Sequence, residues 1–332
     1  MKFLDLFAGI GGFRFGMESA GHECVGFCEI DKFARASYKA IHNTEGEIEL
    51  HDITKVTDEE WRKFRGTVDI ICGGFPCQAF SIAGKRKGFL DETRGTLFFE
   101  IARAAKEIKP SLLFLENVKG LLSHDKGRTF RTILSTLDEL GYDAEWQILN
   151  SKDFGVPQNR ERVFIIGHLR GAGGRPVFPI FGKNETTNQA NIKQIGNISN
   201  STSFGGNPQT GRVYNIDGIS PTLNTMQGGG REPKIAIPVL TLDRAKKRQK
   251  GRRIKTNGEQ MFTLTAQDRH GVMTEYFKIR KLTPRECWKL QGFPDWAFDK
   301  AQEVNSNSQL YKQAGNSVTV NVIKAIAERL EI

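Results

Sequence analysis

The 332-residue sequence predicts an α/β fold with a doubly wound, mostly parallel sheet and a smaller, irregular second domain. Short apolar runs alternate with amphipathic stretches through the first half of the chain, as expected of repeated strand-and-helix units. The apolar runs are continuous rather than alternating in polarity, which is typical of strands buried on both faces. This pattern ends near residue 175, and helical spacing returns only close to the C-terminus.

Six runs rich in Val, Ile, Leu and Phe are the expected strands: 2–7, 24–30, 67–72, 111–118, 144–149 and 162–168. The stretches 95–109 and 127–141 between them have helical spacing, and the second ends at Gly141 as a helix stop would. Ligands of such sheets bind beyond the carboxyl ends of the strands. The turns that follow the expected strands therefore hold the candidate site residues.

The chain divides by composition into a first domain (1–178), a second domain (179–306) and a C-terminal helix (307–332) that returns to the first. The second domain opens with a long stretch rich in Asn, Gly and Ser. It also contains a weak repeat, "DGISPTLNTMQGGG" (217–230) beside "NGEQMFTLTAQDRHG" (257–271). Two copies are too few for a solenoid, so chance and a pair of similar loops both stay open.

The charge pattern favours a polyanionic partner. The formal net charge is +10, and basic residues dominate the run "RAKKRQKGRRIK" (244–255). This run is either a phosphate-contacting stripe or a solvated loop, and we favour phosphate contact.

The five cysteines form no paired CxxC set, so neither a zinc site nor a disulfide framework is indicated, and we expect reduced thiols. No run approaches the roughly 20 apolar residues of a membrane span, and no signal-peptide pattern is present. A cytoplasmic location is expected.

The segment "DLFAGIGG" (5–12) reads as a strand, a glycine-rich turn and the start of a helix, which suits close approach of a ligand to the backbone. It is not a GxGxxG motif, because Arg14 occupies the last position. A dinucleotide is therefore less favoured than another adenosine-containing ligand. Glu29 closes the next strand and Asp52 the following segment. Each acid alone is either a surface or capping residue or a ribose acceptor, and three successive strand ends of this kind favour an adenosine site.

The segment "GGFPCQAFS" (73–81) places Cys77 on a turn after a buried strand. A cysteine there is either a small apolar filler or a nucleophile, and the position at the rim of the sheet favours the nucleophile. Glu116 in "ENV" ends the next strand and is a candidate general acid if burial raises its pKa. Arg160 and Arg162 in "QNRER" would point to one side of an extended strand. They are either an anion or carbonyl clamp or two solvated basic residues.

The ordered motifs "DLFAGIGG", "GGFPCQAFS", "ENV", "QNRER", "LTPRECWKLQGFP" and "QAGNSV" resemble those of the bacterial DNA cytosine-C5 methyltransferases. The resemblance covers nearly the whole chain except roughly 180–270. It implies a Rossmann-like fold dependent on S-adenosyl-L-methionine, with a target-recognition domain in the variable region.

The resemblance assigns cofactor binding to residues at the strand ends and near the C-terminus. Phe7 would stack on the adenine, Glu29 would bind the ribose, and Asp52 with Ile53 would read the adenine. The full expected set is Phe7, Gly9, Gly11, Gly12, Glu29, Ile30, Asp52, Ile53, Leu97, Asn316 and Ser317.

The resemblance also implies that Cys77 attacks C6 of the target cytosine while Glu116 holds and protonates N3. Arg162, with Arg160, would contact the base carbonyl and backbone. Because the ring edge is inaccessible inside a duplex, the base must be flipped into the pocket. The loop from about Gly73 to Arg94 is the expected lid.

The implied partner is double-stranded DNA. The protein would be either the modification partner of a separately acting restriction endonuclease or an orphan regulator. The residues expected to bind DNA are Gln78, Ser81, Lys85, Arg94, Arg231, Lys247, Arg252 and Arg269. Three further side chains, Gln227, Gln267 and His270, are able to read base edges.

Three other functions stay open on the sequence. An RNA cytosine methyltransferase would share the core, although the large basic variable region favours a duplex. A DNA-binding protein without catalysis would keep the fold, although Cys77, Glu116 and Arg162 are all present. A nicotinamide dehydrogenase is disfavoured by Arg14.

Overall fold

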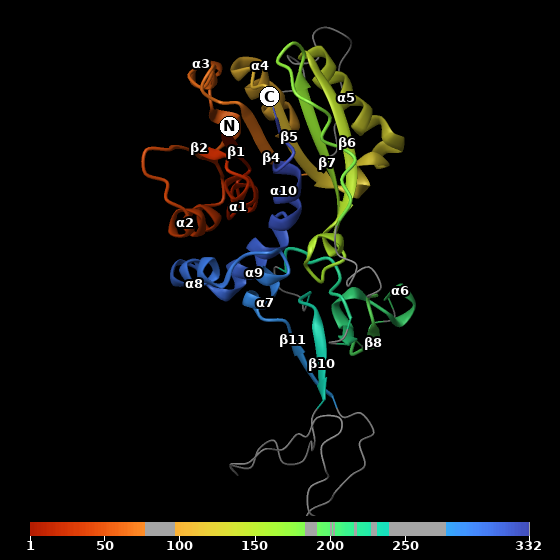
Figure 1. The fold of residues 1–332 in the computed structure, drawn as a ribbon. Coiled ribbons are helices and arrows are strands. Elements are labelled where there is room, and N and C mark those ends of the chain that lie inside the picture. Colours follow the sequence, from red (N-terminus) through yellow and green to blue (C-terminus); the bar gives the residue numbers. More distant parts are fainter. Residues whose placement is uncertain are drawn as a thin grey trace, which may run out of the picture.

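The structure is a computed structural model that describes residues 1–76, 97–182, 191–199, 201, 203–215, 218–226, 231–238 and 277–331. Its larger part is a seven-stranded sheet in the order β3-β2-β1-β4-β5-β7-β6 (Figure 1). The strands are β1 (Lys2–Leu6), β2 (Glu23–Cys28), β3 (Ile48–Leu50), β4 (Ile70–Gly74), β5 (Leu112–Val118), β6 (Tyr142–Asn150) and β7 (Glu161–Leu169).

The first five strands in this order are parallel, whereas β7 runs antiparallel to both β5 and β6. The prediction of a doubly wound, mostly parallel sheet is confirmed. The short edge strand β3 is absent from the six apolar runs, but it agrees with the strand end expected at Asp52. The antiparallel β7 has one consequence for function, which is that its beginning lies at the same edge as the ends of β4 and β5.

Helices cover both faces of this sheet, as the continuous apolar strands require. In the strands other than the edge strand β3, residues contribute to two separate cores on opposite faces. In β5, Leu113 and Leu115 face the core shared with α4 and α5, and Leu112 and Phe114 face the core shared with α1 and α10. The helices of this part are α1 (Gly12–Ser19), α2 (Lys32–Ile41), α3 (Asp58–Arg62), α4 (Leu97–Ile108), α5 (Arg128–Glu139) and α10 (Val320–Ala327).

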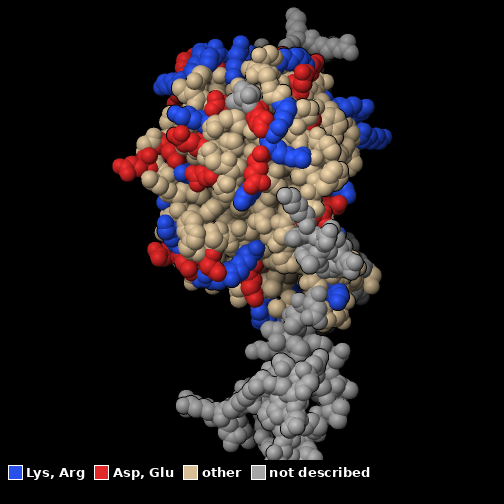
Figure 2. Space-filling model, viewed as in Figure 1, with Lys and Arg blue, Asp and Glu red and all other residues tan. Residues whose placement is uncertain are grey.

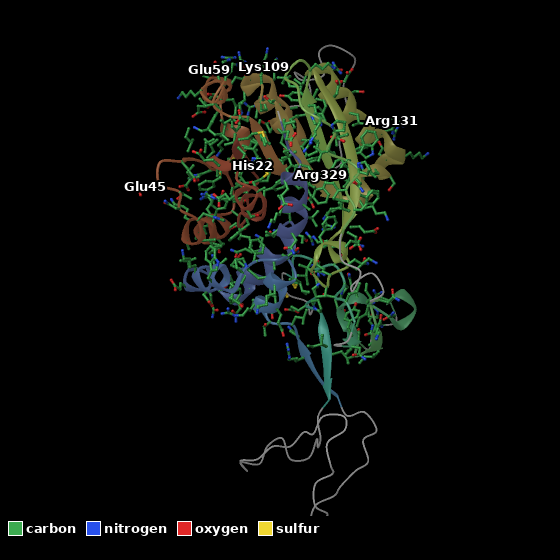
Figure 3. The ribbon with its side chains drawn as sticks, in the orientation of Figure 1. His22, Glu45, Glu59, Lys109, Arg131 and Arg329 are labelled. Carbon is green, nitrogen blue, oxygen red and sulfur yellow. The ribbon has the colours of Figure 1, made fainter. Side chains whose placement is uncertain are left out.

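The C-terminal helix α10 packs directly on α1. A Cβ added to Gly16 of α1 would lie 2.5 Å from the Cβ of Ile323, so only glycine permits this approach. Arg329, labelled in Figure 3, donates hydrogen bonds to the carbonyls of Val177 and Pro179. These bonds join the residues after β7 to the C-terminal residues after α10, which lie about 150 residues apart in the sequence.

A second, four-stranded sheet has the order β11-β10-β9-β8. Its strands are β8 (Gln194–Asn197), β9 (Arg212–Asn215), β10 (Lys234–Pro238) and β11 (Phe277–Lys281), with the short α6 (Ser203–Gly206) nearby in sequence. Between the two sheets lie α7 (Pro284–Lys289), α8 (Asp295–Val304) and α9 (Asn307–Asn316) (Figure 1). These three helices share a core with Ile10, Ile41 and Leu223, and therefore tie the second sheet to the first.

Short 3-10 turns complete the described elements: η1 (Ile53–Lys55), η2 (Lys119–Leu122), η3 (His124–Gly127), η4 (Ser151–Phe154) and η5 (Gln209–Gly211). None of the helices in the described ranges has the length and apolar character needed to cross a bilayer. On the face drawn in Figure 2, basic and acidic side chains are interspersed. The basic run 244–255 lies outside the described residues.

Candidate active site

The glycine-rich turn after β1 forms a compact backbone loop. Phe7, Gly9 and Gly11 all have positive φ, of 56°, 58° and 83°. The Gly11 N–H donates to the carbonyl of Ala8, and α1 begins at the next residue, Gly12. A Cβ added to Gly9 would meet none of the described atoms within 4 Å, so the turn faces open space at the edge of the sheet.

Glu29 fastens this turn to the end of β2. Its Oε2 accepts the Gly9 N–H at 2.8 Å, and its Oε1 accepts the Asp31 N–H at 2.7 Å. Burial raises the pKa of Glu29, although these two N–H donors oppose the shift. A carboxylate held this way has unused lone pairs, which can accept hydroxyl groups of a ligand beside Gly9.

The next strand end supplies Asp52 and Ile53. Asp52 caps η1 by accepting hydrogen bonds from the N–H and the hydroxyl of Thr54, and the hydroxyl bond lowers the pKa of Asp52. Ile53 is buried, whereas Ile30 after β2 is 68% exposed. An apolar side chain exposed to this extent beside Glu29 is available to cover a flat ligand.

The remaining predicted cofactor residues come from distant parts of the chain. Asn316 and Ser317 end α9, and a Cβ added to Gly12 would lie 2.7 Å from Oγ of Ser317. This contact places the α9 terminus directly beside the glycine-rich turn. Leu97 begins α4 and packs against the main core.

Glu116 lies at the end of β5, paired in register with Gly74 at the end of β4. A Cβ added to Gly74 would lie 3.3 Å from Oε2 of Glu116, so glycine keeps this approach open. Only Phe75 and Pro76 separate Gly74 from Cys77 in the sequence. The glycine pair at the end of β4 thus leaves room for a carboxylate next to the start of the cysteine loop.

Arg162 forms an ion pair with Glu116, with 3.0 Å between Nε and Oε1. Residues Val118 and Arg162 are paired in the β5–β7 ladder, so Glu116 and Arg162 are diagonal neighbours on one face. Burial raises the pKa of Glu116, and the charges of Arg162 and Arg160 only partly oppose it. A carboxyl group with a raised pKa beside a fixed guanidinium is suited to holding a proton.

Asn117 has a role that sequence reasoning missed. Its side-chain Nδ2 donates to the carbonyl of Phe75 at 2.8 Å, and the residue is 2% exposed. This bond fixes the backbone two residues before Cys77. The signal was present in "ENV", because a buried amide next to a strand end needs a partner.

Arg160, expected with Arg162 to contact the base carbonyl and backbone, makes hydrogen bonds to protein carbonyls in the structure. It is 3% exposed, and it donates to the carbonyls of Leu223, Gly315 and Ser317 at 3.1, 3.1 and 2.7 Å. Burial and the nearby charge of Arg162 lower the pKa of Arg160 to about 9, while Glu116 opposes the shift. The two arginines of "QNRER" therefore have different partners: Arg162 pairs with the Glu116 carboxylate, and Arg160 donates to backbone carbonyls.

Arg14, the residue that breaks the GxGxxG pattern, is also buried. It makes a bidentate pair with Glu47 at 2.7 and 2.8 Å, and its Nε donates to Glu18 at 2.7 Å. Burial lowers the pKa of Arg14, but Tyr38 and Glu47 outweigh it and the net shift is upward. This position therefore carries a structural ion pair, and it does not approach a phosphate.

Several predicted residues lie outside the described part of the chain. They are Cys77, Gln78, Ser81, Lys85, Arg94, Gln227, Lys247, Arg252, Gln267, Arg269 and His270. Arg231 is described and exposed, three residues before β10. The assignment of Cys77 as the nucleophile and of the other residues to DNA stays a prediction.

Known proteins resemble this chain over its full length. The family of C-5 cytosine-specific DNA methylases matches residues 1–331. The orphan methyltransferase M.SPRI of Bacillus phage SPR is 36% identical, with 99% of this chain and 97% of that protein covered. The type II methyltransferase M.HpaII of Haemophilus parainfluenzae is 38% identical, with 99% and 88% covered.

The type II methyltransferase M.HhaI of Haemophilus parahaemolyticus is 37% identical over 98% of this chain and 93% of that protein. Among solved structures, the Dnmt2 methyltransferase of S. pombe matches with a TM-score of 0.65, 18% identity, and coverage of 99% and 97% of the two chains. At this identity the structural likeness supports the fold alone. The sequence matches confirm the predicted family, and the chain belongs to the C-5 cytosine-specific DNA methylases and is a DNA cytosine-C5 methyltransferase.

Proposed function

We propose that this chain uses S-adenosyl-L-methionine to methylate C5 of a flipped cytosine in duplex DNA, through a covalent bond from Cys77 to C6. The observation that carries the proposal is the buried Glu116–Arg162 pair, which lies at the end of β5 beside the backbone that leads into Cys77. The family membership supports the reaction, and this pair supports the assignment of the residues.

The glycine-rich turn and Glu29 fit the adenosine part of the cofactor. The space over Gly9 lets a ligand approach the backbone closely. The Glu29 carboxylate beside it could accept hydrogen bonds from a ribose, and the exposed Ile30 could cover a flat base. Bound S-adenosyl-L-methionine would supply an electrophilic methyl group on a sulfonium. Arg14 blocks no part of this site, because its guanidinium is directed to Glu47 and Glu18.

The catalytic roles follow from charge and position. C5 of cytosine is a poor nucleophile, and addition of the Cys77 thiolate to C6 places an electron pair on the ring that can pass to C5. Glu116, whose pKa is raised, would share a proton with N3 of the base. This proton would stabilise the negative charge that thiolate addition places on the ring. Arg162 would orient Glu116 and contact the base carbonyl. A water molecule would take the C5 proton, the C5–H electron pair would reform the C5–C6 double bond, and the Sγ–C6 bond would break to release the Cys77 thiolate.

Specificity is proposed to reside in the target-recognition domain, 179–306, which contains the second sheet. The Thr222–Leu223 pair, in the first copy of the weak repeat, fixes this part of the chain to the first domain. Leu223 is buried in the core with α7–α9, and the Thr222 hydroxyl donates to the carbonyl of Asn159. Base contacts are therefore proposed for the residues beyond Met226, including Arg231.

The proposal also concerns a separate restriction endonuclease in the same cell. M.HpaII and M.HhaI are named type II methyltransferases, whereas the phage protein M.SPRI is named an orphan. We propose a role in protecting DNA within a restriction–modification system in the bacterial cytoplasm. Cleavage of unmethylated DNA by an extract of the source cells, with protection of DNA treated by this enzyme, would test it.

The decisive experiment incubates the protein and S-adenosyl-L-methionine with unmethylated genomic DNA and then sequences the DNA after bisulfite conversion. Protection of cytosines within one short motif is expected. Cys77→Ala should abolish protection while DNA binding is kept. Complete conversion by a folded, cofactor-bound protein would contradict the proposal, and transfer to tRNA in a parallel reaction would redirect it to RNA.

A further inference from the structure

Arg160 joins two segments that are far apart in the sequence. One segment is residues 219–226, which we call the clamped segment, and the other is the end of α9 at residues 315–317. Nη1 donates to Leu223 in the clamped segment, and Nη2 donates to both Gly315 and Ser317. The two α9 carbonyls flank Asn316, a residue assigned above to the cofactor site.

The clamped segment runs beside the residues that precede β7. The Ser220 N–H donates to the carbonyl of Pro157 at 2.7 Å, and the Asn159 N–H donates to the carbonyl of Ser220 at 2.9 Å. The Thr222 hydroxyl donates to the carbonyl of Asn159 at 2.6 Å. The backbone of this segment is therefore held by the same stretch that carries Arg160.

The clamped segment also touches the end of α9 directly. A Cβ added to Gly315 would lie 1.9 Å from the carbonyl oxygen of Asn224 and 2.8 Å from the backbone nitrogen of Thr225. Only glycine permits this contact. At its other end the segment reaches Met226, with φ of 45°, and then continues towards Arg231 and the second sheet.

We propose that Arg160 is a positioning residue that couples DNA seated on the recognition part to the cofactor pocket, and that it does not contact the target base. DNA that fixes the chain beyond Met226 would hold the clamped segment, and Arg160 would transmit this constraint to the backbone on both sides of Asn316. This inference rests on the proposed function, since it needs both DNA and cofactor to bind.

Burial and partners separate Arg160 from Arg162. The Nη atoms of Arg160 are already occupied by protein carbonyls, and its Nε is buried without a hydrogen-bond partner among the described residues. Arg162 instead pairs with Glu116, the carboxylate of the catalytic site. A lysine at position 160 would keep the charge, but it cannot span carbonyls from two segments in the planar geometry of a guanidinium.

The test measures binding of S-adenosylhomocysteine by calorimetry, with and without unmethylated DNA made by whole-genome amplification. In the wild type, DNA should tighten this binding by a factor in the range of about 5–150, as is typical of coupled sites. In Arg160→Lys the factor should fall to within about twofold of unity. Arg170→Lys is the matched control at the other end of β7, where Arg170 forms exposed ion pairs, and it should keep the wild-type factor.

Thr222→Val provides a second variant, because it removes one hydroxyl from an exposed residue of the clamped segment. It should lower the coupling factor even if Arg160→Lys fails to fold. A wild-type factor retained in both folded variants would overturn the proposal, as would a wild-type enzyme that methylates DNA but shows no coupling. Absence of methyl transfer by the wild type would instead mark failure of the proposed function, and the inference would fall with it.

Discussion

The two buried arginines, Arg14 near the glycine-rich turn and Arg160 near Glu116, are 4% and 3% exposed but have opposite surroundings. Arg14 meets the carboxylates of Glu47 and Glu18, and its pKa rises. Among the described residues, Arg160 donates to backbone carbonyls; burial and the charge of Arg162 lower its pKa to about 9, although Glu116 opposes the shift. The pKa of a buried arginine thus follows the charges around it: Arg14 contacts carboxylates, whereas the carboxylate near Arg160 is already paired with Arg162.

The largest expected effect lies in the catalytic region. Glu116→Gln keeps the shape of the side chain but removes the group that holds a proton at N3, so kcat should fall by about 10²–10⁴-fold. Methyl transfer from radiolabelled cofactor would measure the rate, and thermal melting would show a folded protein. Near-normal turnover would remove Glu116 from the mechanism.

Removing the Arg14–Glu47 ion pair should lower the stability of the fold instead of the reaction rate. Arg14→Met leaves Glu47 partly buried without its cation, so the free energy of unfolding should fall by about 3–5 kcal/mol. Urea denaturation followed by circular dichroism would measure it. The matched control is Glu18→Gln, which removes a half-exposed partner and should cost less than about 1 kcal/mol. Equal losses in the two variants would show that burial does not distinguish these pairs.

A substitution at Asn117 would show whether the reaction rate depends on the hydrogen bond that holds the backbone at Phe75, two residues before Cys77. Asn117→Ala leaves the carbonyl of Phe75 without its donor, and loss of such a bond is worth about 1–3 kcal/mol, or about 5–150-fold in kcat if it acts on the transition state. Asn321→Ala removes a similar bond to the carbonyl of Phe154, away from the active site, and should leave kcat unchanged. A larger loss of rate in the control would refute the positioning role.

The smallest effect concerns Asp5, which is fully buried beside Tyr38 in the Arg14 region. Burial raises the pKa of Asp5 well above its usual range, although the charge of Arg14 opposes the shift. The stability that Asp5 contributes is fully present below its unfolded pKa of about 3.9, where the carboxyl is protonated. This contribution is lost as the pH rises through the folded pKa, because the buried carboxyl then ionises.

Asp5→Asn should accordingly melt at a higher temperature than the wild type at pH 8, and the difference should shrink as the pH falls towards 4. Asp52→Asn is the comparison, because the Thr54 hydroxyl lowers the pKa of Asp52 and the substitution should bring no gain at pH 8. A wild type more stable than Asp5→Asn at pH 8 would show that the ionised carboxylate is stabilised in the fold.

Much of the architecture was predictable because its causes are local. The continuous apolar runs required burial on both faces, and the two cores on opposite faces of the sheet meet that requirement. The glycines of 5–12 and 73–74 are needed where the backbone turns or a side chain approaches closely, so their positions were informative before any contact was known. The burial of Glu116 and its raised pKa agree with the expected acid.

The sequence by itself determined the strand-and-helix order, the glycine turns and the family, because each depends on residue type and short spacing. Only the tertiary structure decided that β7 runs antiparallel between β5 and β6, which brings Arg162 to Glu116. It also decided which groups Arg14 and Arg160 contact, because their hydrogen-bond partners lie up to 33 and 157 residues away in the sequence. A side chain's role is set by the groups that surround it, and for buried charges those groups come from distant parts of the chain.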